Sequence, residues 1–315
     1  MAKIVEKTAA MDEKTAAIVE KTAGLTEPTT PATPTSEVAN TVRAEPRALV
    51  AASFDDEMLE HAGAGISDRA EDFLLPFLAV AQSNSPQLKK QQAEAYIPGL
   101  KVGDIFDTAT RRFWDGETGL IIVSAFFHKA EVEWITRKNG GGYVATHSAD
   151  TPLRQEVRVD PTDKRTRLLR SGHQLVETNY HFIVIVDTCT PAVVALTSTG
   201  LQTSRQWNTQ MQNVKIRRPD GSLATAPCFG RAYRLRTSYR QNDQGDWFQF
   251  LVEDVGWSNQ SQAQTDARAA ARAFYLNALQ NGVVLGRPPV DESGSGRTID
   301  PDGRDSGISE SDLPI

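Results

Sequence analysis

Eight basic side chains and one acidic side chain lie between residues 202 and 240, which gives this stretch a net charge of +7. The basic residues are Arg205, Lys215, Arg217, Arg218, Arg231, Arg234, Arg236 and Arg240, and the acid is Asp220. Clustered lysine and arginine are typical of surfaces that neutralise phosphate groups. The whole chain carries a net charge of -6, partly because residues 290–315 hold seven acids and two arginines. An acidic tail therefore hides a basic centre.

The segment FGRAYRLRTSYR has the alternation of a strand, in which successive side chains point to opposite faces. One face would carry Arg234, Arg236 and Arg240, and the other would carry Arg231, Tyr233, Leu235 and Tyr239. A row of arginines on one sheet face is costly unless something anionic neutralises it. We expect a phosphate track here. The alternative is a solvated outer face whose arginines pair with acids on neighbouring strands.

Two further basic segments surround possible loops. VKIRRPDGSLATAP places Lys215, Arg217 and Arg218 before the turn PDG, which predicts a basic protruding arm. TDKRTRLLRSGH, over residues 162–173, predicts an exposed loop with more positive charge. An arm beside a basic strand would form a clamp.

Aromatic residues are interleaved with these bases, among them Trp207, Phe229, Tyr239, Trp247 and, further upstream, Trp134. Unpaired bases stack on aromatic rings while lysine and arginine follow the backbone, without sequence preference. Trp207 and Trp134 fit a core position better than a platform, whereas Tyr239 and Trp247 lie near a hairpin end. The predicted nucleic-acid-binding set is Arg205, Lys215, Arg217, Arg218, Arg231, Tyr233, Arg234, Arg236, Tyr239, Arg240, Trp247, Trp134 and Lys129.

Catalytic motifs are missing from the chain, which has no P-loop, no GxGxxG after a strand, no GxSxG and no HExxH. His173, His181 and Cys189 are evenly spaced but lack the close ligand pairs of zinc sites. We therefore expect no enzymatic activity, no metal and no cofactor. A nuclease with scattered acids stays open as an alternative.

Strand patterns dominate the centre, over residues 119–135, 176–187 and 192–197, with short strands in 99–113. A hairpin is expected across QNDQG. Helices are expected over 53–62 with Ser53 as cap, over 199–214 with Thr199 as cap, and over 261–282 with Gly282 as the stop. These elements predict a mainly β fold with inserted and C-terminal helices, as an OB-fold-like barrel.

Both ends differ in composition from this core. Residues 1–47 hold a weak heptad of Ile4, Met11, Ile18 and Leu25 and then a Pro/Thr linker, so we expect either a short oligomerising helix or one that forms only with a partner. The predicted core covers 48–286, and a disordered acidic tail covers 287–315. The chain lacks a membrane-length apolar run and a cysteine framework, which predicts a cytoplasmic protein with reduced thiols.

The last residues, SESDLPI, resemble the acidic tip of bacterial single-stranded DNA-binding proteins, where aspartates precede Ile, Pro and Phe. Asp312, Leu313 and Pro314 match that tip, while Ile315 replaces the phenylalanine and only Glu310 adds a nearby acid. The resemblance implies recruitment of replication or recombination proteins through Glu310, Asp312, Leu313, Pro314 and Ile315. Physically, such a peptide can dock its apolar end in a pocket with a basic rim.

The runs YIPGLKVGDIFDTATRRFWDGETGLIIVSAFFHKAEVEW and LTSTGLQTSRQWNTQM resemble a family of bacteriophage early proteins regarded as binding single-stranded DNA. The resemblance covers most of 48–286 and implies non-sequence-specific binding during phage replication or recombination, in the host cytoplasm. A single-strand annealing protein that forms oligomers is the first alternative. A structural or adaptor protein whose basic face meets an acidic protein is the second.

Overall fold

The structure is a computed structural model that describes residues 60–61, 64–65, 74–161, 163–164, 166–242 and 245–283. The expected helix over 53–62, the heptads and the acidic tip with Glu310, Asp312, Leu313, Pro314 and Ile315 lie outside the described residues or almost wholly so. The strands are β1 (Phe77–Val80), β2 (Ile105–Asp107), β3 (Phe113–Trp114), β4 (Leu120–Ile135), β5 (Gly142–Ser148), β6 (Arg158–Val159), β7 (Arg167–Leu168), β8 (Gln174–Ile185), β9 (Thr190–Thr197), β10 (Lys215–Arg217), β11 (Leu223–Thr225), β12 (Arg231–Asn242) and β13 (Gly245–Trp257). The helices are α2 (Leu153–Glu156), α3 (Gly200–Asn213) and α4 (Gln262–Asn281), with 3-10 turns at Pro86–Leu88, Arg137–Asn139 and Cys228–Gly230.

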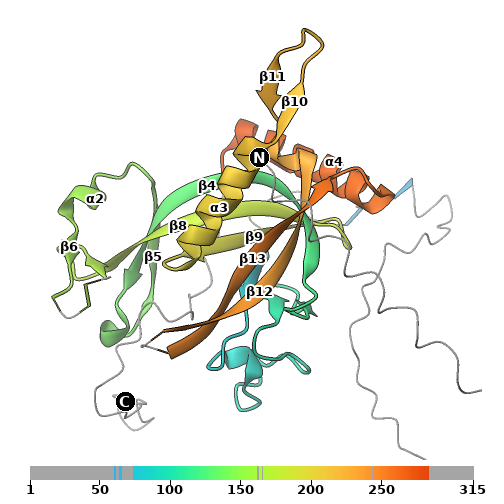
Figure 1. Ribbon diagram of the computed structural model, residues 1–315. Coiled ribbons are helices and arrows are strands. Elements are labelled where there is room, and N and C mark those ends of the chain that lie inside the picture. The colour runs from blue at the N-terminus through green and yellow to red at the C-terminus, as the bar shows by residue number, and fades with distance from the viewer. Residues whose placement is uncertain are drawn as a thin grey trace, which may run out of the picture. The chain divides into compact units, whose positions relative to one another are not determined.

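Eleven strands form one sheet whose main path runs β13-β12-β4-β8-β9-β1-β2-β3. Off this path, β5 pairs with β4, and β7 pairs with both β8 and β6. Neighbours are antiparallel except for the parallel pair β1–β9. The sheet curls into a half-barrel, with α3 lying across one side (Figure 1). The expected mainly β fold with an inserted and a C-terminal helix is confirmed, but the OB-type barrel is not.

A β-bulge divides the longest strand, β4. Its pairing with β8 runs from Ser124 opposite Ile183 to Phe126 opposite Phe182, so Ala125 is the extra residue. Before the bulge the even-numbered residues of β4 point to the inner face of the sheet, and after it the odd-numbered residues do. Bulges bend a strand and increase its twist, which suits the strong curl of this sheet.

The inner core is enclosed by the curled sheet and by α3. Trp207 of α3 is fully buried against Ile122, Ile183 and Leu235 among others. Its indole stacks on the ring of His181 at 4.1 Å between centroids. Because Trp207 fills the inside of the curl, truncating it to alanine would cost about 4 kcal/mol of stability.

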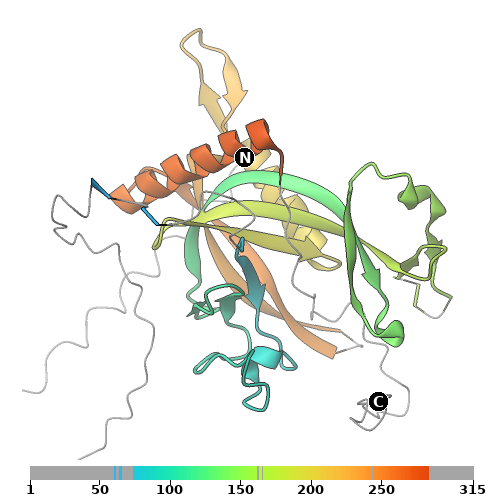
Figure 2. The ribbon, with the colours of Figure 1, turned by 180° about the vertical axis from the view of Figure 1, so that it is seen from behind.

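The outer core lies on the opposite face, where α4 crosses the back of the sheet (Figure 2). Ala267 and Ala271 are fully buried there, and these small side chains let the helix approach Phe126 and Phe182 closely. The side chain of Ser261 caps the helix by accepting a hydrogen bond from the Gln264 amide. The helix ends at Asn281, before Gly282 with φ 79°, as its sequence predicts.

Side-chain bonds, and not a strand ladder, close the curl between β1 and β13. The Gln82 amide donates to the Phe248 carbonyl at 2.8 Å and accepts from its N–H at 2.9 Å. Nearby, Thr237 donates to the Gly103 carbonyl at 2.7 Å and its N–H donates to the Gly116 carbonyl. Gly116 has to be glycine, because a Cβ there would lie 2.0 Å from the Gly103 oxygen.

Most of the expected elements are present. The three long strands, the helix over 200–213, the hairpin across QNDQG and the last helix are all confirmed. The prediction that Thr199 caps the N-terminus of α3 is wrong, because Thr199 makes no side-chain capping bond and has helical backbone angles.

Candidate nucleic-acid interface

The arginines of β12 divide into paired and unpaired ones. Arg231 forms an ion pair with Asp254 and lies over the ring of Trp257, 5.0 Å from its centroid. Arg236 bonds Glu253 at 3.1 Å. Arg234 and Arg240 are exposed and make no ion pair or hydrogen bond with the described residues. The predicted continuous arginine track is thus reduced to two cations without a partner on the outer face of the sheet.

Tyr233 is not available for stacking. It is fully buried, because its side of β12 faces the inner core, where its ring meets Trp207 edge-on at 5.6 Å. Burial raises the pKa of its hydroxyl well above the ordinary value of 10.0. The hydroxyl has no hydrogen-bond partner within the described part of the chain. The predicted alternation of the strand is confirmed, but the tyrosine face at this end belongs to the inner core.

The aromatic residues of the β12–β13 hairpin that reach the surface lie toward its two ends. Tyr239 is 51% exposed and its ring contacts Phe248 edge-on. Trp247 is half-buried and lies opposite Arg240 in the ladder. At the other end, Trp257 is 41% exposed beneath Arg231, and it is not among the residues predicted from the sequence. Its position opposite Arg231 in a predicted hairpin would have identified it.

The predicted arm is a separate two-stranded sheet formed by β10 and β11, directly after α3. It stands clear of the body at the top of Figure 1. Lys215 donates to the Gln212 carbonyl and to Thr225, and Arg217 donates to the Gly221 carbonyl, so both cations bond only neutral groups. Arg218 is exposed, as is Arg205 on α3. Neither forms an ion pair or a side-chain hydrogen bond with another described residue.

A second charged cluster lies at the far end of β4 and β8, and it is neutralised internally. Glu131 is fully buried, with Arg167 at 2.7 Å and Arg154 at 3.3 Å from its two oxygens. Lys129 pairs with Glu177 at 2.9 Å. Burial opposes ionisation of Glu177, but the hydrogen bond and charge of Lys129 outweigh it and lower the pKa below its ordinary value. Lys129 is therefore committed to an acid.

Glu133 continues this cluster between two histidines. His173 lies 2.6 Å from one carboxylate oxygen and His147 lies 2.8 Å from the other. Burial alone would raise the pKa of this carboxyl, but the hydrogen bonds with His173 and His147 outweigh burial and lower the pKa below 4.5. The basic run over 162–173 thus supplies structural partners, Arg167 and His173, as well as exposed charge.

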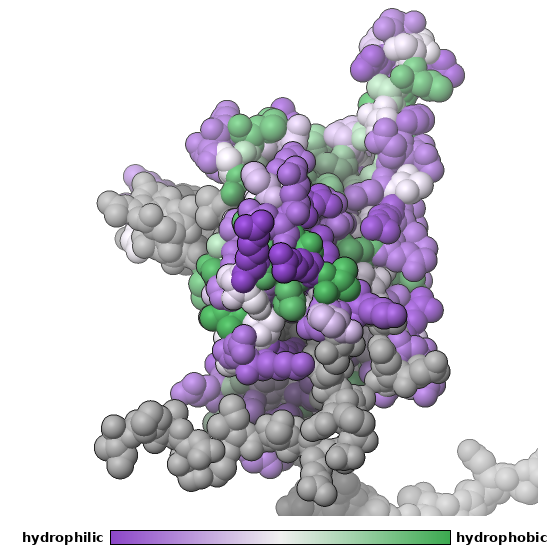
Figure 3. Space-filling view, turned by 90° about the vertical axis from the view of Figure 1, so that its left-hand side faces the viewer, coloured by the Kyte–Doolittle hydropathy of each residue, from purple (hydrophilic) through white to green (hydrophobic). Residues whose placement is uncertain are grey.

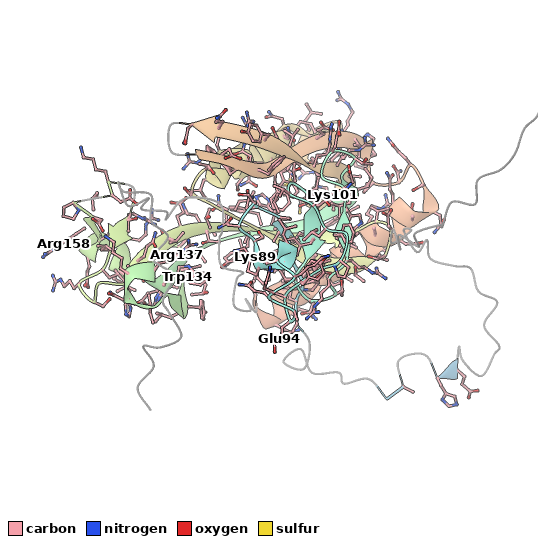
Figure 4. The ribbon with its side chains drawn as sticks, turned by 90° about the horizontal axis from the view of Figure 1, so that it is seen from below. Lys89, Glu94, Lys101, Trp134, Arg137 and Arg158 are labelled. Atoms are coloured by element: carbon pink, nitrogen blue, oxygen red, sulfur yellow. The ribbon has the colours of Figure 1, made fainter. Side chains whose placement is uncertain are left out.

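Trp134 belongs to this end of the molecule. It is half-buried and meets Tyr143 edge-on at 5.8 Å, which fits a packing role. Figure 4 shows Trp134 beside Arg137, with Arg158 further out, on a lobe distinct from the β12–β13 hairpin. The predicted set is therefore divided: Trp134 and Lys129 lie in this lobe, and the other eleven residues lie on α3, β12–β13 and the arm with its turn.

The evenly spaced histidines and cysteine do not meet. His173 bonds Glu133, whereas the buried His181 bonds the Ser204 hydroxyl at 2.8 Å in the inner core. Burial lowers the pKa of His181 to about 3, which keeps its ring neutral. Among the described residues, no group of three or more histidine, cysteine or acidic side chains could hold a metal ion.

The charge of the chain is distributed unevenly along the sequence. Residues 74–283 contain 24 basic and 19 acidic residues, a net charge of +5, whereas the remaining residues contain 10 basic and 21 acidic ones, a net of -11. The body is therefore positive although the chain is negative.

The chain matches a known protein family. The family model described as Pam3 phage gp34-like protein matches residues 44–282. Comparisons with curated proteins and with solved structures found no match. Within the residues that the structure describes, no helix is long and apolar enough to cross a membrane.

Proposed function

We propose that this chain, which belongs to the Pam3 phage gp34-like protein family of phage proteins, binds single-stranded DNA without sequence preference. One observation carries the proposal: two exposed cations without acidic partners lie on the same hairpin as the exposed ring of Tyr239 and the half-buried ring of Trp247. Arg234 and Arg240 would contact phosphates, and Tyr239 and Trp247 would offer stacking surfaces to bases.

The pairing pattern supports this assignment. An exposed arginine gains little from an exposed acid, so leaving one unpaired costs a protein little stability. Even so, Arg231 and Arg236 each have an acid within reach, while Arg234 lies opposite Glu253 in the ladder and does not bond it. An anionic ligand such as a DNA backbone would complete the contacts of Arg234 and Arg240.

The test is a titration of the full chain with a labelled oligo(dT) strand, a matched duplex and a matched RNA at several salt concentrations. We expect the DNA strand to bind more tightly than the duplex, with affinity falling by about 0.7 log units per log unit of salt for each phosphate contact. Failure of the full chain, and of a chain lacking residues 290–315, to bind any strand at low salt would refute the proposal.

The same titration with magnesium present examines the alternatives. We expect the labelled strand to stay intact, since the proposed function is binding without catalysis. Cleavage would replace the proposal with a nuclease. Faster annealing of two complementary strands, with oligomers in light scattering, would favour an annealing protein instead.

For the acidic tip we propose recruitment of replication or recombination proteins in the host cytoplasm. Removing residues 312–315 should leave binding to bare DNA unchanged or tighter, because the deleted segment is anionic. Pull-down of phage or host replication proteins by the full chain, and not by the shortened one, is the expected result. Weaker binding of the shortened chain to bare DNA would contradict this role.

A further inference from the structure

The β10–β11 arm has no support from the main sheet. Its three residue pairs, from Lys215 opposite Thr225 to Arg217 opposite Leu223, form a sheet of their own. An isolated two-stranded hairpin is marginally stable in water. A protein gains little from projecting such a ribbon into solvent unless the ribbon contacts something else.

The surface of the arm is basic and partly apolar. Lys215, Arg217 and Arg218 face one acid, Asp220, which is occupied by Ser222 in the turn. Leu223 is 62% exposed, and the arm forms a knob that stands away from the body in the space-filling view (Figure 3). Pro219 lies in the tight turn that the Arg218 and Ser222 backbones close.

The arm also lacks what a single strand needs. Residues 214–226 contain no aromatic side chain, whereas the β12–β13 hairpin carries Tyr239, Trp247 and Phe248. Stacking on rings provides much of the binding to unpaired bases. A duplex does not need it, because its phosphates and groove edges are read by basic and small apolar side chains.

We propose that the β10–β11 arm enters the groove of duplex DNA, so that the protein sits at a junction between a single strand and a duplex. A two-stranded β-ribbon fits the major groove, which is about 12 Å wide. Lys215, Arg217 and Arg218 contact the flanking phosphates, and Leu223 and Pro219 meet the groove floor. This inference rests on the proposed function, since the single strand beyond the junction is held by β12–β13.

The experiment compares a duplex with a single-stranded extension with the same single strand alone, both titrated into the full chain by fluorescence anisotropy. We expect the tailed duplex to bind about tenfold more tightly, because it adds two or three phosphate contacts. In the variant Lys215→Gln/Arg217→Gln/Arg218→Gln this preference should disappear, while affinity for the single strand falls by less than about threefold.

The matched control removes the same charge elsewhere, as Lys89→Gln/Lys90→Gln/Lys101→Gln. These lysines are exposed in the segment between β1 and β2, where Figure 4 labels Lys89 and Lys101. The control should keep the tenfold preference. If it loses the preference equally, the effect is one of net charge and the arm has no special role.

A label on the arm gives a second measurement that does not depend on removing charge. Ser222→Cys places a thiol in the exposed turn, whereas burial raises the pKa of the Cys189 and Cys228 thiols and slows their labelling. The fluorophore should respond to the tailed duplex and not to the single strand. If both DNAs bind with equal affinity and the label is silent, the inference is overturned and single-strand binding stands. If neither DNA binds, both proposals fail.

Discussion

The far end of β4 and β8 and the surface formed by α3, β10–β11 and β12–β13 are both rich in arginine and lysine, yet they use that charge differently. At the β4–β8 end, Lys129, Arg154 and Arg167 surround Glu131 and Glu177. On the other surface, Arg205, Arg218, Arg234 and Arg240 pair with no acid in the described part of the chain.

This difference shows that the role of a basic side chain depends on whether an acidic side chain pairs with it. In the β4–β8 cluster Glu131 is fully buried and Glu177 is half-buried, so their cation partners are needed for the fold and are not available to a ligand. On the other surface the cations are exposed and contribute little to stability. Stability measurements should therefore respond to one region and binding measurements to the other.

The strongest test of the comparison is Arg154→Gln/Arg167→Gln, which leaves the buried carboxylate of Glu131 without its two cations. Breaking a buried pair from one side costs about 3 kcal/mol of unfolding free energy. Urea unfolding followed by far-UV circular dichroism measures it. Lys129→Gln is the control, because the Lys129 side chain is 33% exposed and the loss of its pair with Glu177 should cost less than about 1 kcal/mol. Equal losses would show that the cluster is not a buried network.

The second test compares arginines on the same strand. Arg234→Gln/Arg240→Gln should lower the affinity for oligo(dT) about tenfold and reduce the salt slope by about 1.4, as expected for two phosphate contacts. Arg231→Gln/Arg236→Gln removes the same charge from residues that are already paired and should lower it less than about threefold. A larger effect of the second pair would reverse the assignment of roles on β12.

A smaller effect is expected from two tyrosines that the sequence places on one strand face. Tyr239→Ala removes an exposed ring and should weaken oligo(dT) binding by about 1 kcal/mol, measured by tryptophan quenching. Tyr233→Phe should leave both binding and stability unchanged, since its hydroxyl is buried without a partner in the described structure. Loss of binding in Tyr233→Phe would mean that the inner core opens to DNA.

The mildest effect concerns acid. The pKa of Glu133 is lowered in the folded state, so its ionised form adds stability above the ordinary value of 4.5. That stability is lost as the pH falls through 4.5 toward the folded pKa. Unfolding midpoints should therefore decline below about pH 4.5 in the wild type and decline less in Glu133→Gln. Identical profiles would show that His147 and His173 do not stabilise the carboxylate.

Sequence periodicity predicted the long strands, the β12–β13 hairpin and α4, because each has a long and regular pattern. It did not predict the bulge of β4, where Ala125 interrupts the alternation, so that even-numbered residues face inward before it and odd-numbered residues after it. The face of the sheet on which Lys129 lies depends on this reversal. Its partner Glu177 lies on β8, and the two side chains come close only because β4 pairs with β8.

The candidate site was predicted in part for the same reason. The alternation of β12 correctly separated Arg234 from Tyr233, but it could not say which face was covered. Burial of Tyr233 depends on Trp207, which reaches it from a helix 26 residues away in sequence. The arm could be predicted because PDG is a local turn signal that needs no tertiary information.

The two hydrogen bonds between Gln82 and the Phe248 backbone have a consequence for local opening of the molecule. The side-chain amide of Gln82 bonds the Phe248 backbone as a peptide group of a neighbouring strand would. The two edges of the half-barrel are therefore joined there by one side chain and not by a ladder of backbone hydrogen bonds. These two bonds can break without breaking any strand pairing. The backbone amide of Phe248 should therefore exchange with deuterium earlier than the amides of the β4–β8 ladder. Water should first enter the inner core between Gln82 and Phe248.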